Sequence, residues 1–192
     1  MASVLEPFAG TDAEAVAGRL VSRFGSLHRA LVSPQGIDGE DAEVLRTIRA
    51  ARALVLAAAR EEISRRPVKA DDPALHVYLK DLLGPHAHER LHAVFLDDRH
   101  GYIADECIAS GSSGRLTGST RNLIARAFDL GARAIILAHN HPSGCAHPSS
   151  EDVDATARIR RIAAELDLAL IDHLIVTRHE VFSFRAGGCF EG

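Results

Sequence analysis

The chain has 192 residues, of which 46% are hydrophobic and 25% charged, a composition typical of a folded globular protein. Its net charge of -4 and isoelectric point near 6.2 argue against a main role in coating nucleic acid, because that role needs a basic surface. No apolar run approaches the roughly 20 residues that span a bilayer. Residues 1–6 also lack the charged-then-apolar pattern of a signal peptide. We therefore expect a cytoplasmic protein that does not associate with membranes.

The three cysteines, Cys107, Cys145 and Cys189, are widely spaced and odd in number. This pattern predicts neither a disulfide framework nor a metal knuckle of the Cys-x-x-Cys type. We expect reduced thiols, and note that Cys145 falls within the histidine-rich segment described below.

The first part of the chain is predicted to be all-helical. Apolar residues recur at helical spacing over residues 13–24, after a capping-box pattern of Thr11 and Glu14, and Gly25 is placed to end the helix. A short helix near residues 27–31 and a long one over residues 41–65 are expected to follow. Residues 65–73 are charged, contain two prolines and show no apolar period, which is typical of a connection. We therefore predict a helical module over residues 1–66 and a second domain over residues 67–192.

The second domain alternates between strand and helix patterns. Short apolar stretches predict strands, and stripes of period 3.6 predict helices. The expected order is a helix near 75–82, a hairpin of 91–96 with 102–108, a helix at 120–130, a buried strand at 134–138, a helix at 150–166, and strands at 168–177 and 181–184. This order predicts an α/β (α+β) fold in which helices flank a mixed β-sheet.

Chemistry is concentrated in residues 139–152, between the buried strand and the following helix. Residues two apart at a strand end point to the same side, so His139 and His141 can offer two imidazoles to one point while Asn140 faces away. Asp152 lies in the first turn of the predicted helix and can supply a third ligand. Two imidazoles and one carboxylate leave the fourth position of a tetrahedral Zn²⁺ for water, as in a catalytic site. The pKa of such a water falls to about 7.

A structural interpretation competes with this one. Ser149 and Asp152 also form a variant of the capping box, and paired histidines at a strand end can simply bind backbone groups. The spacing by itself leaves metal binding and helix capping open, and the two are compatible.

The complete pattern resembles a known family. His139, His141, Ser149 and Asp152 stand at the spacing of the JAMM signature of JAB/MPN metallopeptidases, and the string HNHPSG is similar to the form that RadC-family proteins carry. The resemblance extends from about Leu75 to the end of the chain. It implies a JAB/MPN fold, which is cytidine-deaminase-like. It also implies a zinc-dependent hydrolase of metallopeptidase or isopeptidase type, in which a zinc-bound water attacks an amide carbonyl of a protein or peptide.

The resemblance also implies two further site residues. Glu89 matches the family's glutamate that acts as general acid and base, and as a strand residue it shares a face with Leu91 and Ala93. Alternatives are an exposed charge at the strand end, or Glu106 on the next strand as the base. Ser149 matches the residue that donates a hydrogen bond to the oxyanion, with helix capping as its competing role.

Other positions have no counterpart or depart from the family. His147 and His173 match no catalytic residue, so we expect them to be structural or exposed. Gly111-Ser112 and Thr120-Arg121-Asn122 stand where RadC relatives have Gly-Thr and Pro-Arg-Glu, which predicts a different surface beside the site.

The amino-terminal part resembles RadC in residues 19–27, where that family has a module like the helix-hairpin-helix. Residues 36–39 are longer than the tight glycine turn that meets a DNA phosphate, which argues against DNA binding there. Four arginines could form a basic face or a solvated helix surface: Arg46, Arg49, Arg52 and Arg60. The alternative function is therefore a DNA-repair-associated accessory or DNA-binding protein that uses the JAMM fold as a scaffold, with weak DNA association. The oligomeric state is left open.

Overall fold

The computed structural model describes residues 2–33, 39, 41–111 and 116–190. Contacts between residues divide the chain into two compact units, Met1–Ala58 and Ala59–Gly192. The proposed domain boundary between residues 66 and 67 stays a prediction. No helix in the described ranges combines the length and the apolar character that crossing a membrane requires.

The first unit is helical, as its sequence pattern predicts. A buried cluster that includes Leu5, Leu20 and Leu45 forms its core. The helices here are α1 (Ala2–Ala9), a 3-10 turn (Gly10–Asp12), α2 (Ala13–Phe24), α3 (Leu27–Val32) and the start of α4 (Asp41–Ser64). The sequence analysis names no helix over residues 2–9, and Pro7 within α1 is unfavourable in a helix interior. Burial of Leu5 in the cluster outweighs that local preference.

The two ends of α2 differ in how well they were predicted. The capping box of Thr11 and Glu14 is wrong: Asp12 is the N-cap and makes no side-chain capping bond. The 3-10 turn runs directly into α2, so the N–H of Ala13 already donates to the carbonyl of Gly10. The predicted end at Gly25 is confirmed, since its φ of 78° is left-handed and its N–H donates to Val21.

The second unit is built on a mixed five-stranded sheet of order β2-β1-β3-β4-β5. All neighbouring strands are antiparallel except β3 and β4, which are parallel and joined through α7. Its elements are α5 (Pro73–Leu83), β1 (Glu89–Leu96), β2 (Tyr102–Gly111), α6 (Leu116–Asp129), β3 (Ala134–Asn140), α7 (Ser150–Glu165), β4 (Ala169–Val176) and β5 (Val181–Ser183). The predicted mixed sheet with flanking helices is confirmed.

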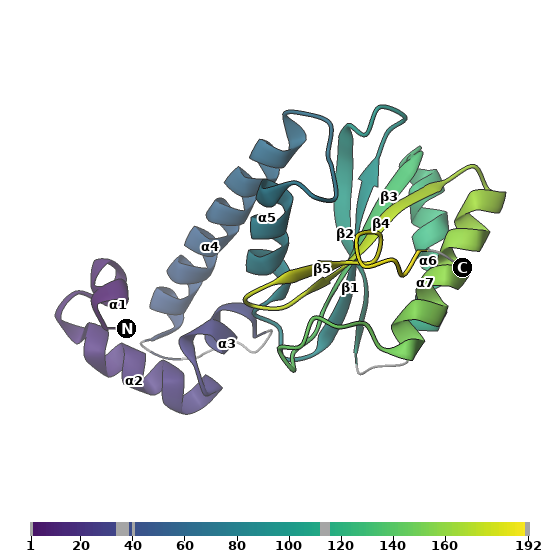
Figure 1. Ribbon diagram of the computed structural model, residues 1–192. Coiled ribbons are helices and arrows are strands. Elements are labelled where there is room, and N and C mark those ends of the chain that lie inside the picture. Colours follow the sequence, from purple (N-terminus) through teal and green to yellow (C-terminus); the bar gives the residue numbers. More distant parts are fainter. Residues whose placement is uncertain (1, 34–38, 40, 112–115, 191–192) are drawn as a thin grey trace. The chain divides into compact units, whose positions relative to one another are not determined.

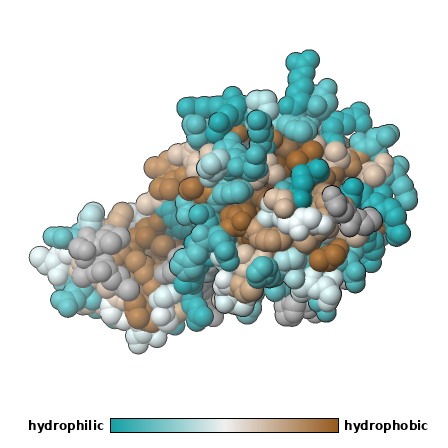
Figure 2. Space-filling view, viewed as in Figure 1, coloured by the Kyte–Doolittle hydropathy of each residue, from teal (hydrophilic) through white to brown (hydrophobic). Residues whose placement is uncertain are grey.

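Helices cover both faces of the sheet (Figure 1). On one face, α6 and α7 pack against Leu91, Ala93 and Phe95 of β1. On the other face lies α5. Because β3 is covered on both sides, all its residues are buried, which explains its apolar run. The outer side of α7, at the right in Figure 2, is hydrophilic.

A buried polar cluster lies on the α5 face. Asp105 of β2 is 1% exposed in its side chain and accepts hydrogen bonds from Tyr78 of α5 and His92 of β1. Tyr102 and Arg60 of α4 also donate to it. Burial acts to raise the pKa of Asp105, but the bonds from His92 and the two tyrosines outweigh it and hold that pKa well below its usual range. The carboxylate therefore joins two helices to the sheet.

Arg49 and Arg60, two of the four arginines considered for a basic face of α4, form bonds within the molecule. Arg60 pairs with Asp105 at 2.6 Å, and Arg49 donates to the carbonyl of Ala30 at 2.7 Å. Residues 36–38, which form most of the turn considered for DNA binding, lie outside the described residues.

Candidate metal centre

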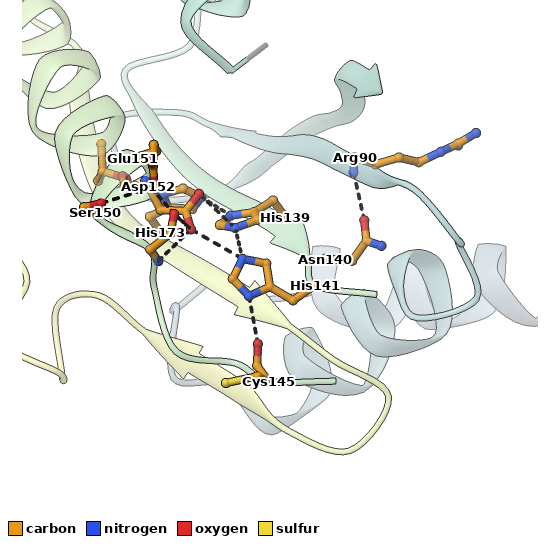
Figure 3. A network of polar contacts seen from close by, with 11 residues as sticks. Arg90, His139, Asn140, His141, Cys145, Ser150, Glu151, Asp152 and His173 are labelled. Atoms are coloured by element: carbon orange, nitrogen blue, oxygen red, sulfur yellow. Dashed lines mark hydrogen bonds and ion pairs between the residues drawn. The ribbon is translucent and has the colours of Figure 1, made fainter. Parts of the chain in front are cut away.

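The end of β3 brings the two histidines to one side. His139 is the second-last residue of β3, and the N–H of His141 donates to the carbonyl of Val176 at 3.0 Å, which continues the extended course beyond the strand. His139 and His141 therefore point to the same side, and Asn140 points to the other (Figure 3). The expected alternation of these three side chains is thus present.

Asp152 reaches the histidines from the first turn of α7. Its carboxylate lies 3.4 Å from Nε2 of His139 through Oδ1, and 3.4 Å from Nε2 of His141 through Oδ2. The capping box is present as well: Ser149 Oγ accepts from the N–H of Asp152, and Asp152 Oδ2 accepts from the N–H and hydroxyl of Ser149. The capping interpretation is thus confirmed, and the cap holds the carboxylate toward the histidines, which is compatible with a role of Asp152 as a metal ligand.

The three side chains converge on a small volume. Nε2 of His139 lies 2.8 Å from Nε2 of His141, and one ligand atom from each of the three residues lies within 4.8 Å of the others. His139 and Asp152 are buried, and His141 is partly exposed. The predicted ligand set is thus gathered at one point that could hold a metal ion.

A chain of hydrogen bonds determines which nitrogen of His139 carries the proton. Thr156 donates its only hydroxyl proton to the carbonyl of Asp152 at 2.6 Å, so its oxygen must accept from Nδ1 of His173, 2.6 Å away. Nε2 of neutral His173 then accepts from Nδ1 of His139 at 2.8 Å. Nε2 of His139 is therefore left with a free lone pair that points into the site.

His141 is oriented in the same way by a backbone carbonyl. Its Nδ1 lies 2.8 Å from the carbonyl oxygen of Cys145, which can only accept, so Nδ1 carries the proton. In neutral His141, Nε2 also presents a lone pair to the site. Such outer partners are what fixes a histidine as a metal ligand.

The site favours a positive charge between these groups. Burial acts to raise the pKa of Asp152, but its contacts with His139 and His141 lower it well below its usual range. The pKa of His141 is raised, chiefly by its bond to Asp152, and the charge of Glu89 adds to this effect. Burial lowers the pKa of His173 well below its usual range, which keeps this residue neutral.

This arrangement fits zinc. Two acceptor nitrogens 2.8 Å apart repel each other unless a proton or a metal ion lies between them. Two imidazole nitrogens and one carboxylate oxygen are a donor set that zinc takes in catalytic sites. The outer nitrogens of both histidines already have partners, so the inner ones are free to bind.

Glu89 lies on the same face of the sheet as the histidines. It is the first residue of β1 and is half-buried. Leu91, two residues later, pairs directly with His139 across β1 and β3, and cross-strand partners share a face. Because residues two apart in a strand also share a face, Glu89 is directed to the side where the imidazoles lie.

The rival base, Glu106, is engaged elsewhere. It forms an ion pair of 2.6 Å with Arg126 of α6, which lowers its pKa. It pairs with Ala93, four residues along β1 from Glu89, or roughly 13 Å at the ordinary rise of a strand. Glu89 is therefore the better-placed carboxylate.

Three residues near the site differ in their relation to it. His173, expected to be structural or exposed, is buried, and its contact with His139 gives it a role in orienting a candidate ligand. His147 is exposed, and its ring lies 6.1 Å from that of Phe182. Cys145 and Cys107 are exposed and Cys189 is partly buried, and all three thiols are free of disulfides.

Sequence reasoning missed the roles of His173, Thr156 and Asn140. A signal was present for His173, because a histidine within the otherwise apolar run 173–176 of a buried strand needs a polar partner. Thr156 lies four residues after Asp152, one turn along the same helix face. No local pattern indicates which partners the amide of Asn140 takes.

The fold and the His-His-Asp group together define a JAB-type domain with a candidate metal centre. Comparison with known proteins agrees: the model of the RadC-like JAB domain matches residues 69–189. The chain belongs to the RadC family of JAB-domain proteins.

Several curated relatives carry only the family designation UPF0758. One from Burkholderia thailandensis is 37% identical over 187 residues, covering 93% of this chain and 70% of the relative. One from Burkholderia mallei is 37% identical over 187 residues, and the match covers 66% of that protein. One from Rhodobacter capsulatus is 34% identical over 181 residues, covering 92% of this chain and 85% of the relative. None of these three names states an activity.

Proposed function

We propose that this protein is a zinc-dependent hydrolase of metallopeptidase or isopeptidase type, which cleaves an amide bond in a protein or peptide. The observation that carries the proposal is the convergence of His139, His141 and Asp152 with their inner lone pairs free. The placement of Glu89 on the same face supports it. We also propose that the protein works in the cytoplasm.

The protein's own residues divide the chemistry between them. Zinc held by His139, His141 and Asp152 would act as a Lewis acid and lower the pKa of a water molecule to about 7. Glu89 would accept a proton from the attacking water and deliver it to the leaving amine.

Ser149 would stabilise the oxyanion that forms when water attacks the carbonyl. Its hydroxyl and its backbone N–H both donate to Oδ2 of Asp152. The hydroxyl can therefore turn toward the oxyanion while the N–H keeps the carboxylate oriented.

Metal content and peptide hydrolysis together test the proposal. Purified protein should hold about one zinc per chain, and His141→Ala should lose it because a ligand is missing. Glu89→Gln should keep the zinc and retain only a small residual rate on peptides that the wild type cleaves. His147→Ala is the matched control, since His147 is exposed and should leave both unchanged. Unaltered zinc content in His141→Ala, or full hydrolysis by Glu89→Gln, would overturn the proposal.

The alternative from the sequence, a DNA-associated accessory protein, remains a prediction. The bonds of Arg49 and Arg60 within the molecule reduce the basic face that it would use. A salt titration of DNA binding tests it, because phosphate contacts cause a steep loss of affinity with salt.

A further inference from the structure

Asn140 stands between the two histidines and makes contacts on the opposite side of the strand. It is 1% exposed, and its amide points away from the imidazoles (Figure 3). Oδ1 accepts from the backbone N–H of Arg90 at 2.9 Å. Nδ2 donates to the carbonyl of His88 at 3.1 Å and to that of His86 at 3.3 Å. One amide thus holds three backbone groups of the segment that enters β1.

These backbone groups enclose Glu89. The carbonyl of His88 belongs to the peptide group before Glu89, and the N–H of Arg90 belongs to the peptide group after it. Each peptide group is planar, so holding both restricts the two rotatable backbone bonds of Glu89. Asn140 therefore limits the direction in which the Glu89 side chain can leave the backbone.

Backbone pairing with β3 does not reach Glu89, so on that side a side chain makes the link. The ladder between β1 and β3 begins at Leu91, opposite His139, so Glu89 lies beyond its end on that side. On the other side Glu89 pairs with Gly111, the last residue of β2. The amide of Asn140 continues the connection between β3 and β1 beyond the ladder, because it binds backbone groups on both sides of Glu89.

We propose that Asn140 is a positioning residue that sets the place of Glu89 relative to the metal ligands, an inference that rests on the proposed function. His139 and His141 leave one side of the strand and Asn140 leaves the other, so three consecutive residues determine both the ligand positions and the position of the base. Asparagine suits this task because one short side chain supplies both an acceptor and two donors. Aspartate would keep the acceptor but place an oxygen against two carbonyl oxygens.

Hydrogen exchange on the full chain tests the contact without reference to activity. In Asn140→Ala the amide of Arg90 loses its acceptor and should exchange roughly tenfold faster. Asn140→Asp should keep that protection, since a carboxylate oxygen still accepts. Asn122→Ala, at an exposed position on α6, is the matched control and should leave the exchange rate of the Arg90 amide unchanged.

Kinetics on the zinc-loaded chain test whether the contact acts through Glu89. Asn140→Ala should lower kcat for peptide hydrolysis by about 100-fold, the order of effect of a misplacement of about 1 Å. Its zinc affinity should fall by less than the roughly tenfold that loss of a histidine's outer partner causes. In a Glu89→Gln background, Asn140→Ala should reduce the remaining rate less than about twofold, because two changes that act through one group are not additive.

The outcomes separate the two proposals. Unchanged protection of the Arg90 amide in Asn140→Ala would overturn the positioning role, as would a full multiplicative effect of this change in the Glu89→Gln background. A loss of zinc in Asn140→Ala would also overturn it, since the ligands and not the base would then depend on Asn140. If the wild type hydrolyses no peptide, the proposed hydrolase function fails, while the exchange rate of Arg90 still decides the contact.

Discussion

Replacing His173 with phenylalanine is expected to weaken zinc binding about 10- to 100-fold while the fold persists. His173 is 1% exposed, and its Nε2 accepts a hydrogen bond from Nδ1 of His139 at 2.8 Å. Phenylalanine can keep the stacking on Phe184, whose ring centroid lies 4.7 Å from that of His173. It cannot accept a hydrogen bond, so the change removes one contact from the outer side of a candidate ligand.

The size of the effect depends on which ring nitrogen of His139 carries the proton in the variant. If Nδ1 keeps its proton, a buried donor has no partner, which costs about 1 to 3 kcal/mol. If the proton moves to Nε2, the lone pair that faces the site is lost and must be restored before metal binds. A loss of 10- to 100-fold corresponds to about 1.4 to 2.7 kcal/mol, which lies within this range.

Competition with a chelator at neutral pH measures the effect. Thr156→Val should weaken binding in the same direction, because the proton on Nδ1 of His173 loses its acceptor. Thr156→Ser keeps the hydroxyl and serves as the matched control. Thermal unfolding of the metal-free variants checks the fold. Zinc affinity of His173→Phe within about twofold of the wild type would refute the reasoning, since removal of an outer partner normally costs at least about tenfold.

Three further predictions concern stability, each measured by urea unfolding of the metal-free protein. Asp105→Asn should lower the free energy of unfolding at neutral pH by about 3 to 5 kcal/mol, because it leaves Arg60 and its other donors without their charged acceptor. The folded-state pKa of Asp105 is lowered, so its contribution to stability is complete above the unfolded pKa of 3.8 and is lost as pH falls through the folded pKa. The stability difference between wild type and variant should therefore shrink as pH falls below 3.8. A difference that stays constant with pH would contradict the lowered pKa of Asp105. Ser149→Ala should cost about 1 kcal/mol through loss of the N-cap of α7, and no loss would show that the capping box does not stabilise the helix. Gly25→Ala should cost about 1 kcal/mol or more, since a side chain is strained at its φ of 78°, and an unchanged stability would argue against that conformation.

The elements themselves were largely accessible from local pattern. The apolar run before His139 predicts a strand buried on both faces, and the stripes of α6 and α7 predict helices that cover a sheet. Errors occurred where packing overrides local preference. No helix was named over residues 2–9, where α1 contains Pro7, and the 3-10 turn before Ala13 stands in place of the cap predicted from Thr11 and Glu14.

The candidate ligands were accessible for a related reason. His139, His141 and Asp152 lie within fourteen residues of one another, on a strand end and the helix that follows, so local geometry nearly determines that they can meet. Glu89 came from family resemblance instead, because it lies on a strand whose neighbours in the sheet no local pattern specifies.

Local periodicity in the sequence therefore determined the strand tip, the helix start and the three side chains that could hold a metal. Tertiary structure alone decided the outer contacts of that group: His173 from β4 beneath His139, and the segment before β1 held by Asn140. These contacts join residues more than thirty positions apart, across strands whose order is set by how the whole sheet packs. Spacing along the chain carries no information about such pairs, because strand order is a property of the assembled core.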